Sequence, residues 1–226
     1  MGRETLHWFR LLTPGALAAF YFLTVRDPTL SAEHVRNMFS RWEGLAVVIC
    51  VLAGYPYRVF DVRRIFLSDF WKSINTNIED ALVDITKSRR ALTVDEEAYL
   101  RDQRRLMDVF YRIIDNDESL KSKMSGIYFN GYLTTLGVDI LTVSGLAAIV
   151  HGAVWAMSGT ALHLKWVLGC AVIAFLAWVM FRRSIKRHLA LSNEQLRGIR
   201  NFYADKVSES VGNILRNMSP RTPQSP

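Results

Sequence analysis

The chain contains little cysteine. Of its 226 residues only Cys50 and Cys170 are cysteines, and each lies inside an apolar run. Two isolated thiols make neither a disulfide framework nor the Cys and His spacing of a zinc site. Within an apolar run a free cysteine acts as a small apolar side chain. The sequence therefore predicts no structural disulfide and no metal site.

Sequence signatures of enzymes are also missing. There is no Gly-x-Ser-x-Gly turn, no glycine-rich phosphate loop, no His-Glu-x-x-His motif and no dinucleotide fingerprint. The acidic stretch at residues 115–119 resembles a calcium loop in charge, but Leu120 occupies the position of the turn glycine. We expect a protein that is not an enzyme and that has no cofactor.

Apolar residues, in contrast, make up half of the chain and lie in four blocks separated by charged segments. Residues 132–157 and 164–181 are each about long enough, at 1.5 Å per residue, to cross a hydrocarbon core of roughly 30 Å. Residues 8–25 and 44–60 form two shorter blocks. No small-x-small cleavage site follows the first block, so we expect a retained helix there and not a signal peptide.

This pattern predicts an all-α, polytopic membrane protein with four transmembrane helices and a cytoplasmic helical hairpin between the second and the third. Residues 1–60 form a membrane helix pair with a short amphipathic outer loop at 26–43, and residues 61–127 form the cytoplasmic hairpin. Residues 128–181 form a transmembrane hairpin, and residues 182–226 form a basic cytoplasmic tail with a disordered end. In the alternative arrangement the first two blocks dip into the membrane and return, which leaves two crossings.

Positive charge predicts the orientation of these helices. The net charge is +7, and residues 182–226 carry nine basic and three acidic side chains. The positive-inside rule places both termini and the middle region in the cytoplasm, with the helices in the cell inner membrane. We expect lipid headgroup contacts from the basic residues that follow the fourth block: Arg182, Arg183, Lys186 and Arg187. Few aromatic residues interleave with these cations, so nucleic acid is not an expected partner.

The predicted cytoplasmic hairpin consists of two amphipathic helices. Apolar residues recur at helical spacing over 67–85, and Thr93 with Glu96 has the spacing of a capping box that opens a second helix over 94–114. Each helix has one apolar face, which packs on the other helix, on the membrane or on another subunit. The candidates for binding a cytoplasmic protein partner are Phe70, Trp71, Met107 and Phe110.

Asp139 lies within the third apolar block and is the first intramembrane functional candidate. An ionised carboxylate there costs on the order of 3 kcal/mol, so the side chain is expected to face protein or water. Asp139 either belongs to an ion or proton pathway, or it makes an interhelical hydrogen bond with a Thr or Tyr neighbour. A basic partner is available only if Arg10 or Arg58 reaches it from its own helix.

Four further residues mark one side of the same helix. Ser144, Ala148 and Gly152 are spaced by four, a pattern that permits close helix packing within the hairpin or between subunits. His151 lies beside this row and is a second intramembrane candidate, either as a pH sensor or as a packed histidine.

The layout of four short spans with a charged helical insert resembles that of small membrane components in bacterial antiviral systems, although no diagnostic motif accompanies it. We expect a non-enzymatic, homo-oligomeric inner-membrane protein whose cytoplasmic helices and basic tail bind a protein partner. It would act as an anchor, sensor or effector in a bacterial defence or stress system. The alternative is a small ion channel or pore-forming effector in which Asp139 faces the pathway.

Overall fold

The computed structural model describes residues 3–30 and 43–218, and every regular element in these ranges is helical. The predicted all-α class is therefore confirmed for this part of the chain. Two compact units are present: unit 1 comprises Met1–Ser68 and Tyr128–Arg187, and unit 2 comprises Asp69–Ile127 and His188–Pro226. The core of the predicted outer amphipathic helix, residues 31–42, and the Pro-rich end, residues 219–226, lie outside the described residues.

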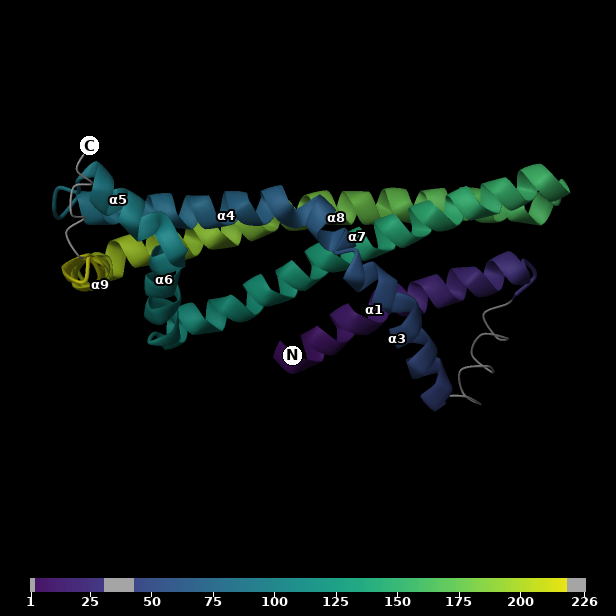
Figure 1. Ribbon diagram of the computed structural model, residues 1–226, viewed down its shortest axis with the longest axis horizontal. Helices are drawn as coiled ribbons and strands as arrows, with labels where there is room; N and C mark the ends of the chain where they lie inside the picture. Colours follow the sequence, from purple (N-terminus) through teal and green to yellow (C-terminus); the bar gives the residue numbers. More distant parts are fainter. Residues whose placement is uncertain (1–2, 31–42, 219–226) are drawn as a thin grey trace, which may run out of the picture. The chain divides into compact units, whose positions relative to one another are not determined.

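In unit 1, helix α1 (Arg3–Arg26) packs against α3 (Glu43–Val59) (Figure 1). The two backbones come closest at Gly15, where an added Cβ atom would lie 1.6 Å from the carbonyl oxygen of Cys50. Only glycine permits this approach. After α3 the chain turns at Asp61, whose φ of 45° is left-handed, and α4 (Val62–Lys87) begins.

The predicted transmembrane hairpin corresponds to α7 (Glu118–Ser158) and α8 (Ala161–Phe202), which are long and apolar enough to cross a membrane by length and composition. Gly159, with a left-handed φ of 66°, and Thr160 connect them. In unit 1 the Asn130 Nδ2 atom donates to the carbonyl oxygen of Ser184 at 2.7 Å. An added Cβ on Gly137 would lie 3.1 Å from the Cβ of Phe181, so the two helices are in close contact there.

In unit 2 the predicted capping box is present, but the helix that follows it differs from the prediction. The Thr93 side chain accepts from the Glu96 backbone N–H, and the Glu96 side chain accepts from that of Thr93. The predicted second helix is divided into α5 (Val94–Arg101), a 3₁₀ turn (Asp102–Arg104) and α6 (Arg105–Asp115). Gln103 and Arg104 adopt left-handed φ values of 51° and 61°, which no single α-helix accommodates. The break allows α5 and α6 both to contact α9 (Ala204–Arg216).

The described part of the predicted basic tail is helical through most of its length. Helix α8 continues to Phe202, and α9 follows it within unit 2. Val207, Val211 and Leu215 recur every four residues on α9 and are buried. Their apolar stripe requires a partner, and the tail therefore packs in the same unit as the middle region.

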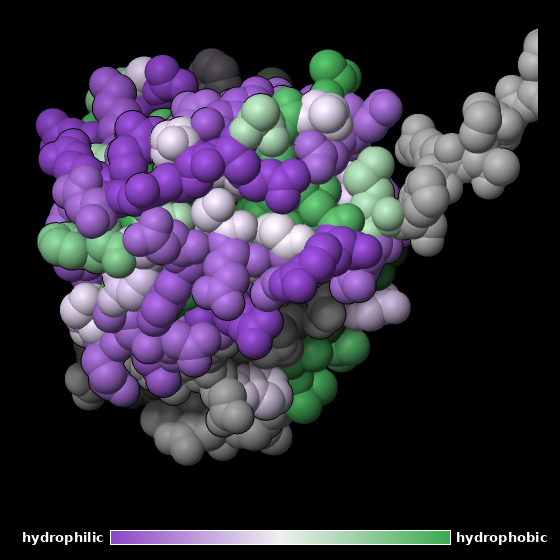
Figure 2. Space-filling view, turned by 90° about the vertical axis from the view of Figure 1, so that its left-hand side faces the viewer, coloured by the Kyte–Doolittle hydropathy of each residue, from purple (hydrophilic) through white to green (hydrophobic). Residues whose placement is uncertain are grey.

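The four predicted partner-binding candidates differ in their burial. Phe70, Met107 and Phe110 are buried in unit 2, where they are core side chains and are not accessible to a partner. Trp71 remains 37% exposed and stays a candidate. Figure 2 shows the face of the molecule on the side of α5 and α9, which is mostly hydrophilic.

Asp117 begins α7 within unit 2. Its carboxylate accepts from the Ser119 hydroxyl at 2.6 Å, from the Leu120 backbone N–H at 2.7 Å and from the Tyr203 hydroxyl. These hydrogen bonds lower the pKa of Asp117 to about 2. The residue is therefore an ionised N-cap at neutral pH, which suits the positive end of a helix dipole.

Three polar side chains on one side of α8 are buried in unit 2 without full pairing. His188 Nδ1, Ser192 Oγ and both amide atoms of Gln195 have no hydrogen-bond partner among the described residues. His188 packs edge-on against Phe70 and Trp71, and its burial lowers the pKa of the imidazole. An unpaired buried polar group costs about 1–3 kcal/mol, so this stripe makes the helix packing in unit 2 weaker than its apolar area implies.

The approach at Gly15 predicts a strong effect of one added methyl group. Gly15→Ala is expected to separate α1 from α3 and to lower the melting midpoint of the purified protein in detergent by at least about 5 °C. Gly145→Ala is the matched control, because an added Cβ there meets nothing within 4 Å. An unchanged midpoint for Gly15→Ala would contradict the α1–α3 packing.

The polar stripe predicts stabilising substitutions. Gln195→Met and Ser192→Ala remove unpaired groups without adding much volume, and each is expected to raise the melting midpoint by a few degrees, corresponding to roughly 1 kcal/mol. Asn130→Leu is the contrasting variant, because Asn130 is buried with its hydrogen bonds made, and its midpoint is expected to fall. A lower midpoint for Gln195→Met would indicate that its amide is hydrated in solution.

Candidate functional site

Unit 1 buries polar side chains and exposes apolar ones. Its large exposed side chains include Leu146, Ile149, Met157, Leu168, Val172, Phe175 and Leu176. Its buried polar side chains are Thr24, Asn130, Thr134, Thr135, Asp139, Ser144, His151, His163 and Ser184. A water-soluble protein has the opposite distribution, and unit 2 follows that usual pattern with an apolar core.

Asp139 is buried in unit 1, with its side chain 1% exposed. The guanidinium of Arg63 binds both carboxylate oxygens: Nε donates to Oδ1 at 2.8 Å, and Nη2 donates to Oδ2 at 2.6 Å. The hydroxyl of Tyr57 donates to Oδ1 at 3.0 Å. This bidentate pairing is the strongest geometry that an arginine and a carboxylate can adopt.

The chain turn at Asp61 brings these partners to Asp139. Tyr57 lies in the last turn of α3, and Arg63 lies in the first turn of α4. Arg63 Nη2 also donates to the backbone carbonyl oxygen of Arg10 in α1. Arg63 therefore connects α4 to α7 and to α1, and Tyr57 connects α3 to α7.

The structure confirms part of the sequence interpretation of Asp139 and corrects another part. A tyrosine hydrogen bond was expected and is present. The basic partner is Arg63 and neither of the expected arginines: Arg10 contributes a backbone oxygen, and its buried Nε has no hydrogen-bond partner among the described residues. The side chain of Arg58 lies outside what the structure describes. The sequence interpretation placed Arg63 outside the membrane segment, because it could not show the turn that directs this side chain back toward α7.

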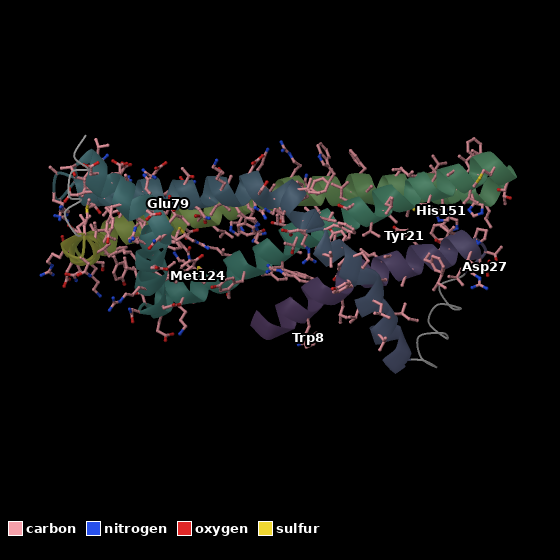
Figure 3. All side chains as sticks on the ribbon, viewed as in Figure 1. Trp8, Tyr21, Asp27, Glu79, Met124 and His151 are labelled. Atoms are coloured by element: carbon pink, nitrogen blue, oxygen red, sulfur yellow. The ribbon has the colours of Figure 1, made fainter. Side chains whose placement is uncertain are left out.

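A second buried polar cluster joins α1, α7 and α8 in unit 1. Thr24 Oγ1 donates to the carbonyl oxygen of Tyr21 at 2.8 Å and lies 3.2 Å from His151 Nε2. Because the hydroxyl proton of Thr24 is directed to Tyr21, the Nε2 of His151 must donate to Oγ1. His151 Nδ1 then accepts from His163 Nδ1 at 3.0 Å, which assigns the tautomer of both rings when they are neutral. Tyr21 and His151 are labelled in Figure 3.

The small-residue row next to His151 packs inside the chain. Ser144 Oγ lies 2.9 Å from the hydroxyl of Tyr21, and Ala148 packs on the cluster that contains Tyr21 and Cys170. An added Cβ on Gly152 would lie 3.9 Å from a methyl group of Val167 in α8. Gly152 therefore faces α8 within the predicted hairpin, whereas Ser144 contacts α1.

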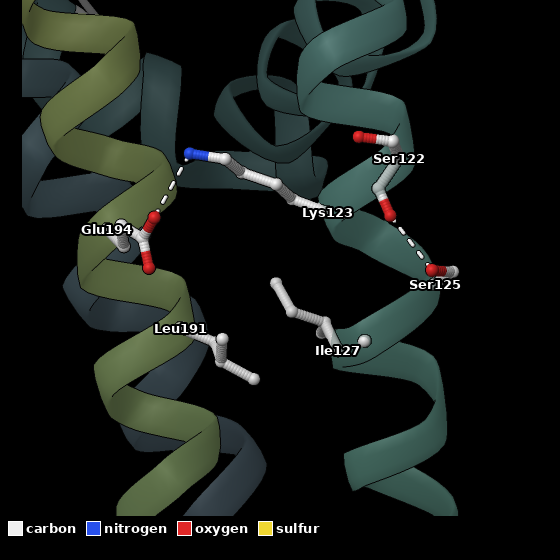
Figure 4. Close-up of a pocket in the computed structure, with 7 residues that line it drawn as sticks. Ser122, Lys123, Ser125, Ile127, Leu191 and Glu194 are labelled. Carbon is white, nitrogen blue, oxygen red and sulfur yellow. Dashed lines mark hydrogen bonds and ion pairs between the residues drawn. The ribbon is translucent and has the colours of Figure 1, made fainter.

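Unit 2 contains a pocket of about 260 Å³ between α7 and α8 (Figure 4). Lys123 Nζ and Glu194 Oε1 form an ion pair at 3.0 Å across it. Ser122 and Ser125 donate to backbone carbonyl oxygens of α7. The two charged side chains pair with each other, and the two serine hydroxyls bind the backbone, so these groups do not form a nucleophile–base pair. Within residues 3–30 and 43–218, no group of three or more His, Cys, Asp or Glu side chains could hold a metal ion.

The chain matches no protein-family model, no curated protein and no solved structure. The functional conclusion therefore rests on the arrangement of its own residues.

The Asp139 ion pair predicts a pronounced double-mutant cycle. Arg63→Met and Asp139→Leu each leave the other charge buried and unpaired and are each expected to cost about 3–5 kcal/mol, whereas the double variant should recover much of this loss. The measurement is the melting midpoint of each purified variant in detergent.

The control for this cycle is the Lys123–Glu194 pair, whose side chains are 50% and 57% exposed. Lys123→Ala is expected to change the free energy of unfolding by less than about 1 kcal/mol. Additive effects of the Arg63 and Asp139 substitutions would contradict a structural ion pair.

Proposed function

We propose that this protein is a non-enzymatic, homo-oligomeric protein of the cell inner membrane, with unit 1 in the bilayer and unit 2 binding a protein partner in the cytoplasm. The observation that carries this proposal is the distribution of side chains in unit 1, where polar groups are buried and large apolar side chains are exposed. In water such a surface would promote aggregation, whereas hydrocarbon is a favourable environment for it.

The proposed topology has four crossings, made by α1, α3, α7 and α8. Helix α1 has 24 residues and α3 has 17, which correspond to about 36 Å and 26 Å. The positive-inside rule favours a cytoplasmic location for the two termini and for unit 2. The hydrogen bonds made by the buried side chains of Asp139, Asn130, Ser144 and His151 in unit 1 support this insertion, because an unpaired polar group in hydrocarbon is costly.

Unit 2 is the proposed binding region for the partner. Most of its large apolar side chains are buried, and its charged side chains are at the surface, as in a soluble helical domain. With Phe70, Met107 and Phe110 in the core, contact with a partner would use Trp71 and the hydrophilic faces of α5, α6 and α9. In this role the membrane helices act as an anchor that positions unit 2, in a sensor or effector of a bacterial defence or stress system.

The alternative, an ion channel lined by Asp139, has less support. Asp139 is buried, and both of its carboxylate oxygens are bound by Arg63. A pathway-lining carboxylate would instead face water and the permeating ion.

Isolation of the full chain from its source cells tests the proposal. After extraction in mild detergent, we expect a complex of defined mass that contains several copies of this chain and a soluble protein. Trp71→Ala is expected to reduce the amount of the co-purified protein several-fold, whereas Phe202→Ala, at an exposed aromatic position of unit 2 outside these faces, serves as the control. A monomer without a partner would overturn the proposal.

Reconstituted bilayers separate the two functional alternatives. Asp139→Asn is expected to leave ion flux at the level of protein-free vesicles, as the wild type does. A wild-type flux that Asp139→Asn changes would overturn the anchor proposal in favour of the channel.

A further inference from the structure

The basic surface of unit 1 for which the sequence predicts lipid headgroup contacts lies on α8. Arg182, Arg183, Lys186 and Arg187 occupy two successive turns of this helix, and all four are exposed. None of the four has an ion-pair or hydrogen-bond partner among the described residues. This differs from Arg63 in the same unit, which is bound to Asp139.

The opposite side of these turns is attached to α7, which directs the four cations outward. Phe181 is buried at Gly137, and Ser184 is buried against Asn130, with Ser184 Oγ 3.2 Å from Asn130 Oδ1. The helix cannot rotate to bury its basic side without breaking both contacts. The cations are therefore held on a rigid surface, so that ligand binding does not have to order the backbone.

Aromatic side chains precede the cations on the same helix. Phe175 and Trp178 are stacked with ring centroids 5.9 Å apart, and they are 60% and 47% exposed. Trp178 lies one helical turn before Arg182. Exposed aliphatic residues, then aromatic residues and then cations follow one another along α8, which is the order of a helix that leaves hydrocarbon and enters the headgroup layer.

No acidic residue on α8 competes for these cations before Glu194, which lies in unit 2. Arg182 with Lys186 and Arg183 with Arg187 form two i, i+4 pairs. The members of each pair are separated by about 6 Å along the helix axis. Arginine guanidinium groups bind phosphate oxygens in a bidentate manner, and each helical turn offers two cations.

We propose that this surface binds an anionic phospholipid with two phosphates, one at Arg182 and Arg183 and one at Lys186 and Arg187. One phosphate would leave two of the four cations without a phosphate contact, whereas two phosphates one helical turn apart contact all four. The inference rests on the proposed insertion of unit 1 in the membrane, and it names the lipid class that α8 selects.

The test uses the full chain in nanodiscs of phosphatidylcholine that contain either cardiolipin or twice the molar amount of phosphatidylglycerol, so that the phosphate content is equal. Lipids retained after transfer to detergent are counted by native mass spectrometry. We expect the wild type to retain cardiolipin and to lose phosphatidylglycerol. Replacement of all four cations by Gln is expected to reduce cardiolipin retention by at least about tenfold.

The matched control carries Gln at four exposed basic residues of unit 2, at Arg112, Lys121, Arg197 and Arg200, and is expected to retain cardiolipin as the wild type does. Equal retention of the two lipids by the wild type would overturn the two-phosphate site, as would unchanged retention by the α8 variant. Two other outcomes would overturn a lipid ligand. In one, inorganic pyrophosphate displaces the lipid and the wild type shows no preference between the two lipids; in the other, nucleic acid co-purifies with the wild type and is lost only from the α8 variant.

Alkaline extraction of the same membranes separates the two proposals. Extraction of the chain would contradict insertion, whereas a chain that stays in the membrane without lipid selectivity would contradict only this inference.

Discussion

The ion pair between Arg63 and Asp139 is the interaction on which the packing of unit 1 depends. A carboxylate that is 1% exposed cannot remain ionised among apolar side chains unless a cation and hydrogen-bond donors replace the lost water. The chain supplies them through a left-handed residue at Asp61, which ends α3 and begins α4 so that Tyr57 and Arg63 both reach Asp139. The same guanidinium binds the Arg10 carbonyl oxygen, so one charge pair determines how α1, α3, α4 and α7 meet.

The two units have opposite distributions of polar and apolar side chains between interior and surface. In unit 1, hydroxyl, amide and imidazole groups pair inside the protein, and aliphatic side chains form the surface. In unit 2, aliphatic side chains form the core, and ion pairs such as Arg101 with Asp80 lie at the surface. Helix α8 contributes to both units, and its pattern changes accordingly: Leu168 and Val172 are exposed, whereas Leu196 and Ile199 are buried. The proposed insertion of unit 1 in the bilayer, with unit 2 in water, would account for this reversal.

These arrangements also narrow the functional interpretation. The small residues Ser144, Ala148 and Gly152 contact α1 and α8 of the same chain, so contacts between subunits would use other surfaces. Asp139 is bound by protein groups and does not resemble a carboxylate held ready for a moving ion. The hydrophilic faces of unit 2 and the basic turns of α8 remain as polar surfaces, and they support the proposed binding role over the proposed channel.

The sequence by itself determined the helical class, the two long apolar helices and the capping box at Thr93, because these features depend on residues close together in the chain. It also identified Asp139 as a buried acid that needs a partner. Tertiary structure alone decided that the partner is Arg63, that α5 and α6 are separate helices, that the tail joins unit 2, and that Phe70, Met107 and Phe110 are core residues. Each of these outcomes depends on contacts between residues far apart in the chain. The sequence pattern shows that a helix has an apolar face or a charge within an apolar run. It does not show which distant segment packs on that face or pairs with that charge.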